Sequence, residues 1–396
     1  MCASKVAGLL FWAVALLFIA TQQSRAGSAD PILIGQTMPY SGPASSYGTI
    51  GRVEAAYFDM INAEGGVNGR KVKLLSLDDG YSPPKAFELT RKLVEQDKVL
   101  LIFGTFGTPT NAVIKKYLNS KHVPHLFATG GAVQWNDPQH FPWTFGWQPN
   151  YKTEMAIYAA YLLKQKPQAR IGILYQNDDV GRDNLQGLKD ALGERAVDLI
   201  LKEVSYESTD SSVESQVISI KEAGADVFFN AAAGKFAAQA IRKAADLNWT
   251  PLQFLNNYSS SVATVLKPAG LAQSKGIISS QFQKDPTDPR WKDDAGYRDW
   301  VGFMDRYYPA GDKRDIFNVY GYLSAMTLVE VLKRCGDDLS RENIRRQAES
   351  LREVALPLLL QGISLNTSSA QHVPIHQLNM MRFSGETWEL FGETLE

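Results

Sequence analysis

Cysteine is scarce in this sequence of 396 residues, and the two that are present are Cys2 and Cys335. Cys2 precedes the first apolar run, so it does not have the position of the lipid-modified cysteine that follows such a run in bacterial lipoproteins. Cys335 is the single cysteine in the rest of the chain, which excludes a disulfide within that part. A chain of this size buries enough apolar surface to fold without one.

An excess of charge of either sign is also absent, because 41 lysines and arginines stand against 42 aspartates and glutamates. The sequence has no basic cluster of the kind that binds the phosphate backbone of nucleic acids. We therefore exclude a nucleic-acid partner. With 44% apolar residues, the composition gives no sign of disorder.

Long charge-free apolar runs are absent except near the N-terminus, where one extends from Val6 to Ala20. Lys5 precedes this run, and the small residues Ser24 and Ala26 follow it at the spacing of a signal-peptidase site. The run is too short to span a bilayer comfortably, so we predict a secretory signal peptide over residues 1–26, cleaved after Ala26. A single uncleaved membrane anchor is the alternative. The mature protein is expected to be soluble and periplasmic.

Most of the chain alternates between apolar strand patterns and helical patterns. Such alternation predicts parallel sheets with helices on both faces. Two series of this kind flank the aromatic stretch at 141–150, which predicts two doubly wound α/β lobes. The strands are expected at 31–38, 72–80, 98–103 and 123–131, and then at 170–178, 198–206, 225–233 and 250–260. The helices are expected at 49–66, 85–96, 111–120, 181–194, 211–224 and 235–247.

The C-terminal part of the chain shows a different pattern. A helical region covers about 291–349, and the tail returns to strand patterns at 361–366 and 376–392. The last of these reads as a hairpin with Ser384-Gly385 at the turn. Neither segment can form a domain alone, so each is expected to complete one lobe.

This arrangement requires the chain to cross between the lobes three times. We expect the crossings, which would form the hinge, near 147–150, 281–286 and 356–361. The predicted lobes are residues 27–147 with 283–356, and residues 148–282 with 357–396.

Motifs of known catalytic and metal sites are missing. The sequence has no GxSxG, HExxH, Walker or CxxC motif, and GTFGTPT (104–110) lacks the lysine of a phosphate loop. His122 and His125 have an odd spacing on one strand, which directs them to opposite faces and disfavours a shared metal site. We therefore expect no metal, no cofactor and no enzymatic activity. A hydrolase that uses Asp79 and Asp179 across a cleft is the alternative, although such carboxylates are more typical of turns and caps.

Four segments in order carry a resemblance to a known family: ILIGQTMPYSGPASSYG (32–48), VLLIFGTFGTPTNAV (99–113), RIGILYQNDDVGRDNLQGLKDAL (170–192) and FNVYGYLSAMTLVEVLKRCG (317–336). They resemble the periplasmic solute-binding proteins of the branched-chain amino acid (Leu/Ile/Val) transporter type, and the similarity covers nearly all of the chain after residue 26. The resemblance implies a type I periplasmic binding protein whose two lobes close on a ligand around a three-stranded hinge. It also implies docking on the membrane permease of an ABC importer, and we expect a monomer.

The resemblance places the anion-binding part of the site in the first lobe. In relatives, a Ser or Thr after the third strand binds the ligand carboxylate, and Thr108 matches it. Its place before Pro109 predicts a helix N-cap, with free N–H groups and the positive end of the helix dipole facing the cleft. A purely structural cap is the alternative. By the same match, Thr129, Gly130 and Gly131 complete the carboxylate pocket, while Tyr47 and Phe106 form aromatic walls; a core position is the alternative for Phe106.

The second lobe departs from the amino-acid pattern. Amino-acid binders carry a Glu or Asp for the ligand ammonium where this sequence has Tyr258, and aromatic residues where it has Val180 and Ala233. A buried ammonium without a carboxylate partner is costly, and Asp179 is the candidate substitute. We therefore predict a small carboxylate ligand without an α-ammonium, of the benzoate or hydroxycinnamate kind. A branched-chain or other amino acid, a urea-type amide, and a ligand sensor domain are the alternatives.

Overall fold

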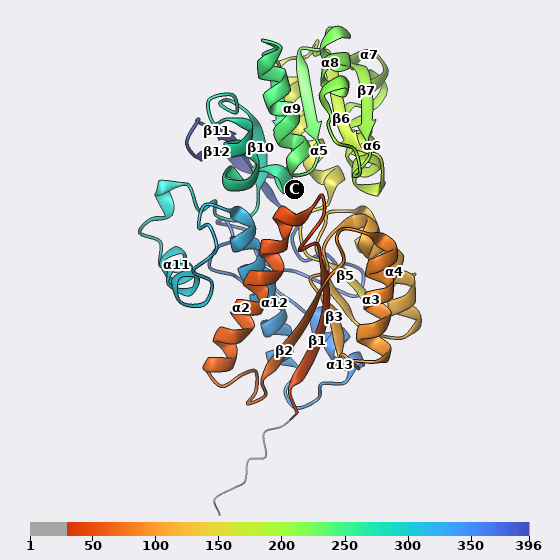
Figure 1. Cartoon of the computed structure of the whole chain (residues 1–396), viewed down its shortest axis with the longest axis vertical. Coiled ribbons are helices and arrows are strands. Elements are labelled where there is room, and N and C mark those ends of the chain that lie inside the picture. Colours follow the sequence, from red (N-terminus) through yellow and green to blue (C-terminus); the bar gives the residue numbers. More distant parts are fainter. Residues whose placement is uncertain (1–29, 396) are drawn as a thin grey trace, which may run out of the picture.

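The computed structural model describes residues 30–395, which form two lobes stacked along the long axis of the molecule (Figure 1). The predicted signal peptide and its cleavage site lie outside these residues. None of the described helices is long and apolar enough to cross a membrane.

A parallel sheet forms the centre of the first lobe, the lower one in Figure 1. Its strands are β1 (Ile32–Met38), β2 (Val72–Asp78), β3 (Leu101–Phe103), β4 (His125–Ala128) and β5 (Thr144–Gly146), in the order β2-β1-β3-β4-β5. The first four lie where strands were predicted. β5 was not predicted, because its three residues fall within an aromatic, proline-containing stretch without a strand pattern.

Helices from distant parts of the sequence cover this sheet. They are α2 (Thr49–Ala63), α3 (Pro83–Glu95) and α4 (Thr108–Ser120), followed much later by α12 (Ile316–Arg334) and α13 (Arg341–Ala348). α11 (Ala295–Tyr307) packs on the outside of α2. α12 is buried along nearly its whole length and packs on α2. Gly321 permits this close approach, because a Cβ there would lie 2.7 Å from the carbonyl oxygen of Ile50.

The second lobe contains a larger, mixed sheet. Its strands are β6 (Ile171–Gln176), β7 (Ile200–Tyr206), β8 (Val227–Ala231), β9 (Leu252–Leu255), β10 (Ile278–Gln281), β11 (Leu378–Phe383) and β12 (Trp388–Leu395), in the order β12-β11-β10-β9-β8-β6-β7. β6 to β10 pair in parallel, whereas β11 and β12 form the predicted antiparallel hairpin. β10 was not predicted as a strand. The helices are α5 (Tyr151–Gln165), α6 (Asp179–Leu192), α7 (Ala196–Leu199), α8 (Glu214–Glu222), α9 (Lys235–Asp246) and α10 (Lys267–Ala269).

Short polar side chains begin several of these helices. The side chains of Asn150, Asp178, Asp294, Asp315 and Ser340 each accept a hydrogen bond from a backbone N–H of the following turn. These groups have no partner within the helix, so such caps fix where each helix starts. Three of the capped helices, α5, α6 and α12, begin at the space between the lobes.

The last crossing between the lobes comes later than expected. Residues 358–360 do pair with 282–284, since Leu360 N donates to Phe282 O at 3.0 Å. The chain then returns to the first lobe, where His372 Nδ1 donates to Thr144 O at 2.9 Å and the His372 ring stacks on Phe145 at 3.9 Å. Residues 361–375 therefore pack with the first lobe rather than the second. The strand predicted at 361–366 is reduced to an isolated bridge between Leu365 and Val354.

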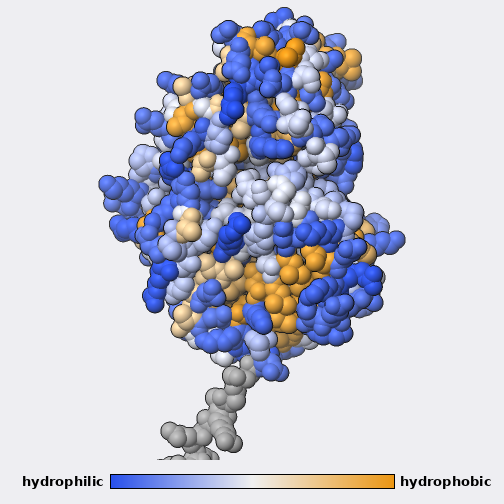
Figure 2. Space-filling model, in the orientation of Figure 1, coloured by the Kyte–Doolittle hydropathy of each residue, from blue (hydrophilic) through white to orange (hydrophobic). Residues whose placement is uncertain are grey.

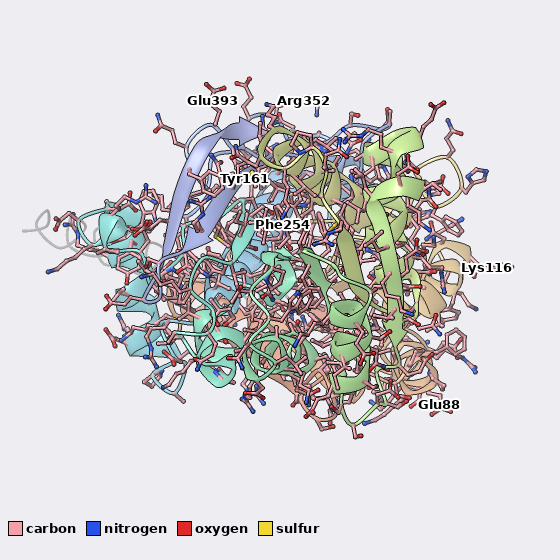
Figure 3. All side chains as sticks on the ribbon, turned by 90° about the horizontal axis from the view of Figure 1, so that it is seen from above. Glu88, Lys116, Tyr161, Phe254, Arg352 and Glu393 are labelled. Atoms are coloured by element: carbon pink, nitrogen blue, oxygen red, sulfur yellow. The ribbon has the colours of Figure 1, made fainter. Side chains whose placement is uncertain are left out.

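Apolar packing holds each lobe together. In the second lobe, Tyr161 of α5 packs against Phe254 of β9 with ring centroids 6.3 Å apart, and both are labelled in Figure 3. In the first lobe, apolar side chains reach the surface in the region where Figure 1 places β1 and β2 (Figure 2). Leu74, Leu75 and Leu77 of the edge strand β2 are partly exposed, because no strand pairs beyond them.

Candidate functional site

A cleft lies between the two lobes at the carboxyl ends of their parallel strands, the usual position of ligand sites in open α/β sheets. Both lobes and the crossing segments contribute residues. Eight predicted site residues line it: Tyr47, Phe106, Thr108, Thr129, Gly130, Val180, Ala233 and Tyr258. Whether they bind a ligand stays a prediction.

Thr108 begins α4 but is not its N-cap, which corrects the predicted role. The cap residue is Gly107, whose φ of 97° suits glycine, and it makes no side-chain cap bond. The hydroxyl that bonds back to the loop belongs to Thr110, which donates to Gly107 O at 2.9 Å. The Thr108 hydroxyl is thereby left in the cleft, where its contact is the Tyr151 hydroxyl at 3.5 Å. It is available to a ligand beside the first turn of the helix.

Gly130 and Gly131 have different places. Gly130 lines the cleft with a φ of 146°, and a Cβ there would lie 3.1 Å from Thr108 Oγ1. Its backbone N–H makes no hydrogen bond within the described part of the chain. Gly131 does not line the cleft. It lies under Tyr151, where a Cβ would come within 2.8 Å of the ring, and its carbonyl accepts from Tyr151 N at 2.7 Å.

Aromatic rings form much of the wall. Tyr47 stacks on Phe106 with centroids 4.5 Å apart, and Tyr151 meets Tyr258 edge to face at 5.3 Å. The Tyr258 hydroxyl donates to Ala231 O at 3.1 Å, which fixes its ring. Burial raises the pKa of both the Tyr47 and Tyr258 phenols, so both are neutral hydrogen-bonding groups at physiological pH.

The acidic residues considered from the sequence lie elsewhere. Asp179, the candidate partner for a ligand ammonium, is partly exposed outside the cleft lining and pairs with Arg182 at 2.6 Å. It also accepts from Gln134 Nε2 at 3.1 Å. Asp79 is buried, caps a turn by accepting from Tyr81 N at 2.8 Å, and does not line the cleft. The two carboxylates therefore do not face a common substrate position.

The cleft lining has no charged side chain among the residues that the structure describes. Its polar groups are hydroxyls and amides, in an otherwise apolar and aromatic wall. Sequence reasoning missed several lining residues because they lie on crossing segments, at the start of α5 or on α12, away from the strand–loop pattern. These residues are Gln148, Tyr151, Gln281, Gln283, Phe317 and Tyr320.

Hydrogen bonds join the lobes across the cleft, so the structure represents a closed arrangement. The Tyr47 hydroxyl donates to the Tyr258 carbonyl at 2.8 Å, and the Ser261 hydroxyl donates to Asp315 at 2.9 Å. At the mouth of the cleft, Val133 N donates to Asp183 Oδ2 at 2.9 Å. Opening the lobes would break all three bonds.

Comparison with known proteins agrees with this architecture. A family described as "Periplasmic binding protein" matches residues 31–387. The chain belongs to this family. Its two lobes match the type I fold, and its relatives include Leu/Ile/Val-binding protein homologues. Members of this family are extracytoplasmic solute-binding proteins that work with ABC transporter permeases.

Individual relatives are distant. The "Leu/Ile/Val-binding protein homolog 1" of Brucella suis is 22% identical over 326 residues, covering 80% of this chain and 82% of the relative. A branched chain amino acid ABC transporter protein from Thermus thermophilus, solved with bound valine, has a TM-score of 0.83 at 16% identity and covers 93% and 97% of the two chains. A solute binding protein from R. palustris in complex with benzoate has a TM-score of 0.78 at 20% identity, with coverage of 91% and 96%. At these identities the solved structures establish the fold only.

Proposed function

We propose that this binding protein takes a small carboxylate without an α-ammonium, most simply an aromatic acid, and delivers it to the permease of an ABC importer. One observation carries the proposal: the described cleft lining contains no carboxylate. An α-ammonium enclosed there would lose its hydration without gaining an oppositely charged partner. Asp179, the one acid considered for this role, lies outside the cleft lining and pairs with Arg182 and with Gln134 of the other lobe.

Donor groups for a carboxylate gather on one wall of the cleft. They are the Thr108 hydroxyl, the Gly130 N–H and the backbone N–H groups of the first turn of α4. The helix dipole adds positive potential at the same point. This arrangement can bind an anion without a cationic side chain. We infer that Thr108 and Gly130 hold the carboxylate, while Thr129 supports the loop because its hydroxyl donates to Gly104 O at 3.3 Å.

Aromatic walls favour a planar ligand. Tyr47 and Phe106 form a stacked pair on one side, and Tyr258 with Tyr151 lies on the other. Flat rings pack against such walls with offset or edge-on contacts. The small side chains of Val180 and Ala233 leave room in the second lobe. The benzoate-bound structure from R. palustris shows that this fold accommodates such a ligand in another protein.

Amino-acid binding is the second candidate, favoured by the valine-bound Thermus structure and by the naming of the Brucella relative. In this chain it would require the ammonium to be satisfied by carbonyl, hydroxyl and amide oxygens alone. Such bonds are weaker than a bond to a carboxylate.

A thermal-shift screen of purified residues 27–396 separates the two candidates. The panel should contain leucine, valine and phenylalanine beside aliphatic and aromatic acids. A ligand at about 100 times its Kd adds roughly 2.7 kcal/mol of apparent stability. We expect stabilisation by aromatic acids, whereas stabilisation by amino acids alone would contradict the proposal.

A further inference from the structure

Two polar atoms of the cleft have no hydrogen-bond partner among the described residues: Gln283 Oε1 and the Tyr320 hydroxyl. Both residues line the cleft, with exposed fractions of only 2% and 4%. The Tyr320 hydroxyl faces the Thr129 side chain without a hydrogen bond of normal length and angle. An unpaired polar atom in a buried position costs about 1–3 kcal/mol. A bound molecule that pairs with these atoms would recover that cost.

The orientation of the Gln283 amide defines what such a molecule must offer. Its Nε2 donates to the Ile316 carbonyl at 3.4 Å, and a carbonyl can only accept. Oε1 is therefore the unpaired atom, and it needs a donor. A ligand carboxylate cannot supply one, because an ionised carboxylate only accepts. The second polar group of the ligand must carry an O–H or N–H.

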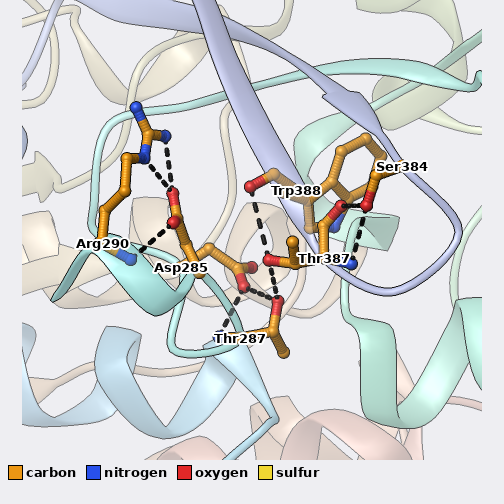
Figure 4. Close-up of polar contacts among 7 residues, drawn as sticks. Asp285, Thr287, Arg290, Ser384, Thr387 and Trp388 are labelled. Carbon is orange, nitrogen blue, oxygen red and sulfur yellow. Dashed lines mark hydrogen bonds and ion pairs between the residues drawn. The ribbon is translucent and has the colours of Figure 1, made fainter. Parts of the chain in front are cut away.

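Both side chains stand on fixed elements. The Gln283 backbone bridges to Leu359, and the residues after it are tied to the β11–β12 hairpin, where Thr287 Oγ1 meets Thr387 Oγ1 at 3.1 Å (Figure 4). Tyr320 lies on α12 with its ring against Trp147, centroids 4.6 Å apart. Held in this way, neither group is free to turn away and find another partner.

We propose that Gln283 and Tyr320 form a second polar subsite that recognises a neutral hydrogen-bond donor on the ligand. This inference rests on the proposed function and sharpens it, because the preferred ligand becomes an acid that also bears a hydroxyl or amide N–H. Hydroxy-substituted aromatic acids are the simplest members of that class. An unsubstituted acid leaves both atoms unpaired and binds more weakly.

Matched pairs of ligands test the subsite by isothermal titration calorimetry on residues 27–396. The pairs are benzoate with meta- and para-hydroxybenzoate, and cinnamate with para-hydroxycinnamate. We expect the best hydroxylated member to bind at least about tenfold more tightly than its parent, the effect of one net hydrogen bond to a buried group. In Gln283→Leu and in Tyr320→Phe this ratio should fall toward one. Tyr322→Phe is the control, because Tyr322 lies on the same helix and does not line the cleft.

The outcomes distinguish this inference from the proposed function. Equal binding of parent and hydroxylated acids, or a preference that survives both variants, overturns the subsite while leaving carboxylate binding in place. Failure of every acid to bind overturns both the subsite and the proposed function. Circular dichroism melting checks that each variant folds. Tyr320→Phe removes a single oxygen atom, so it keeps the test valid if Gln283→Leu does not fold.

Discussion

Thr108 is the side chain whose hydroxyl is left free to meet a ligand at the start of α4. Thr108→Val keeps the branched shape but removes the donor, so it should weaken binding of the best acid by about tenfold, the value of one hydrogen bond to a charged group. Thr108→Ser keeps the hydroxyl, so its Kd for the same acid should lie within about threefold of the value for the unchanged protein. Calorimetry measures both. Equal affinity in the Val variant would remove Thr108 from the carboxylate site.

Glu54 shows how a buried carboxyl should make stability depend on pH. It accepts hydrogen bonds from Gln36 Nε2 at 2.5 Å and from Ser324 Oγ at 2.7 Å, and burial raises its pKa to about 8 from an ordinary 4.5. Between these values the unfolded chain loses the proton while the folded chain keeps it. The free energy of unfolding therefore falls as pH rises from about 5 to 8.

Glu54→Gln removes this titration. The free energy of unfolding, measured with urea at several pH values, should fall less steeply with pH in the variant. The difference in slope should be up to about 1.4 kcal/mol per pH unit. Asp315 and Glu154 also have a raised pKa, about 7 each, so part of the slope should persist. An unchanged slope would mean that Glu54 does not hold a proton in the folded protein.

At the residue level, the sequence predicted the site best where a loop follows a strand. Thr108, Thr129 and Tyr258 follow β3, β4 and β9, so the strand pattern together with the family resemblance placed them in the cleft. Gln283 and Tyr320 follow no predicted strand, and a glutamine in a crossing segment has no distinctive pattern. Asp179 lies outside the cleft lining, and its contacts with Arg182 and with Gln134 of the first lobe are not evident from the sequence.

At the scale of elements, Gly131 determines how closely the start of α5 approaches the loop after β4. A Cβ at this position would lie 2.7 Å from Pro149 O and 2.8 Å from the Tyr151 ring. Gly131→Ala should therefore displace Tyr151, destabilise the protein by about 1–3 kcal/mol and weaken ligand binding. Thermal melting and calorimetry measure these effects.

Gly302→Ala is the matched control. Gly302 lies within α11, and a Cβ added there would meet no atom within 4 Å. Alanine at this position should be neutral or stabilise the helix by about 0.5–1 kcal/mol. If both variants lost the same stability, close packing around Gly131 would not be the cause.

The two strands that the sequence did not predict, β5 and β10, escaped prediction for the same physical reason. β5 is three residues long, and its burial depends on His372 and Val373 from the far end of the chain. β10 pairs with β9 through a single residue pair and with β11 through four. Both strands are held by contacts distant in sequence, which a local pattern cannot express. The long apolar helix α12, in contrast, lies within the helical region predicted over about 291–349.

For the molecule as a whole, closure around the ligand should depend on contacts at the mouth of the cleft. Asp183 of α6 accepts from Val133 N of the other lobe, whereas Asp190 of the same helix pairs with Lys152 within its own lobe. Asp183→Ala should speed ligand dissociation by about two- to tenfold, the effect of one modest hydrogen bond. Asp190→Ala should leave the rate unchanged. Stopped-flow displacement measures both, and equal rates would contradict a role of this contact in closure.

The two-lobed architecture was accessible from the sequence because alternating strands and helices, repeated twice, allow few other folds. The route of the chain near its end was not. Residues 361–375 were expected in the second lobe, and the packing of the His372 ring on Phe145 holds them in the first.

The most direct test of the central claim compares two ligands that differ by a single group. Phenylpropanoate and L-phenylalanine share a ring and a carboxylate, and the second adds only the α-ammonium. Calorimetric titration of residues 27–396 with each should show at least about tenfold tighter binding of phenylpropanoate, because the cleft lining offers no carboxylate to the ammonium. Tighter binding of phenylalanine would contradict the claim.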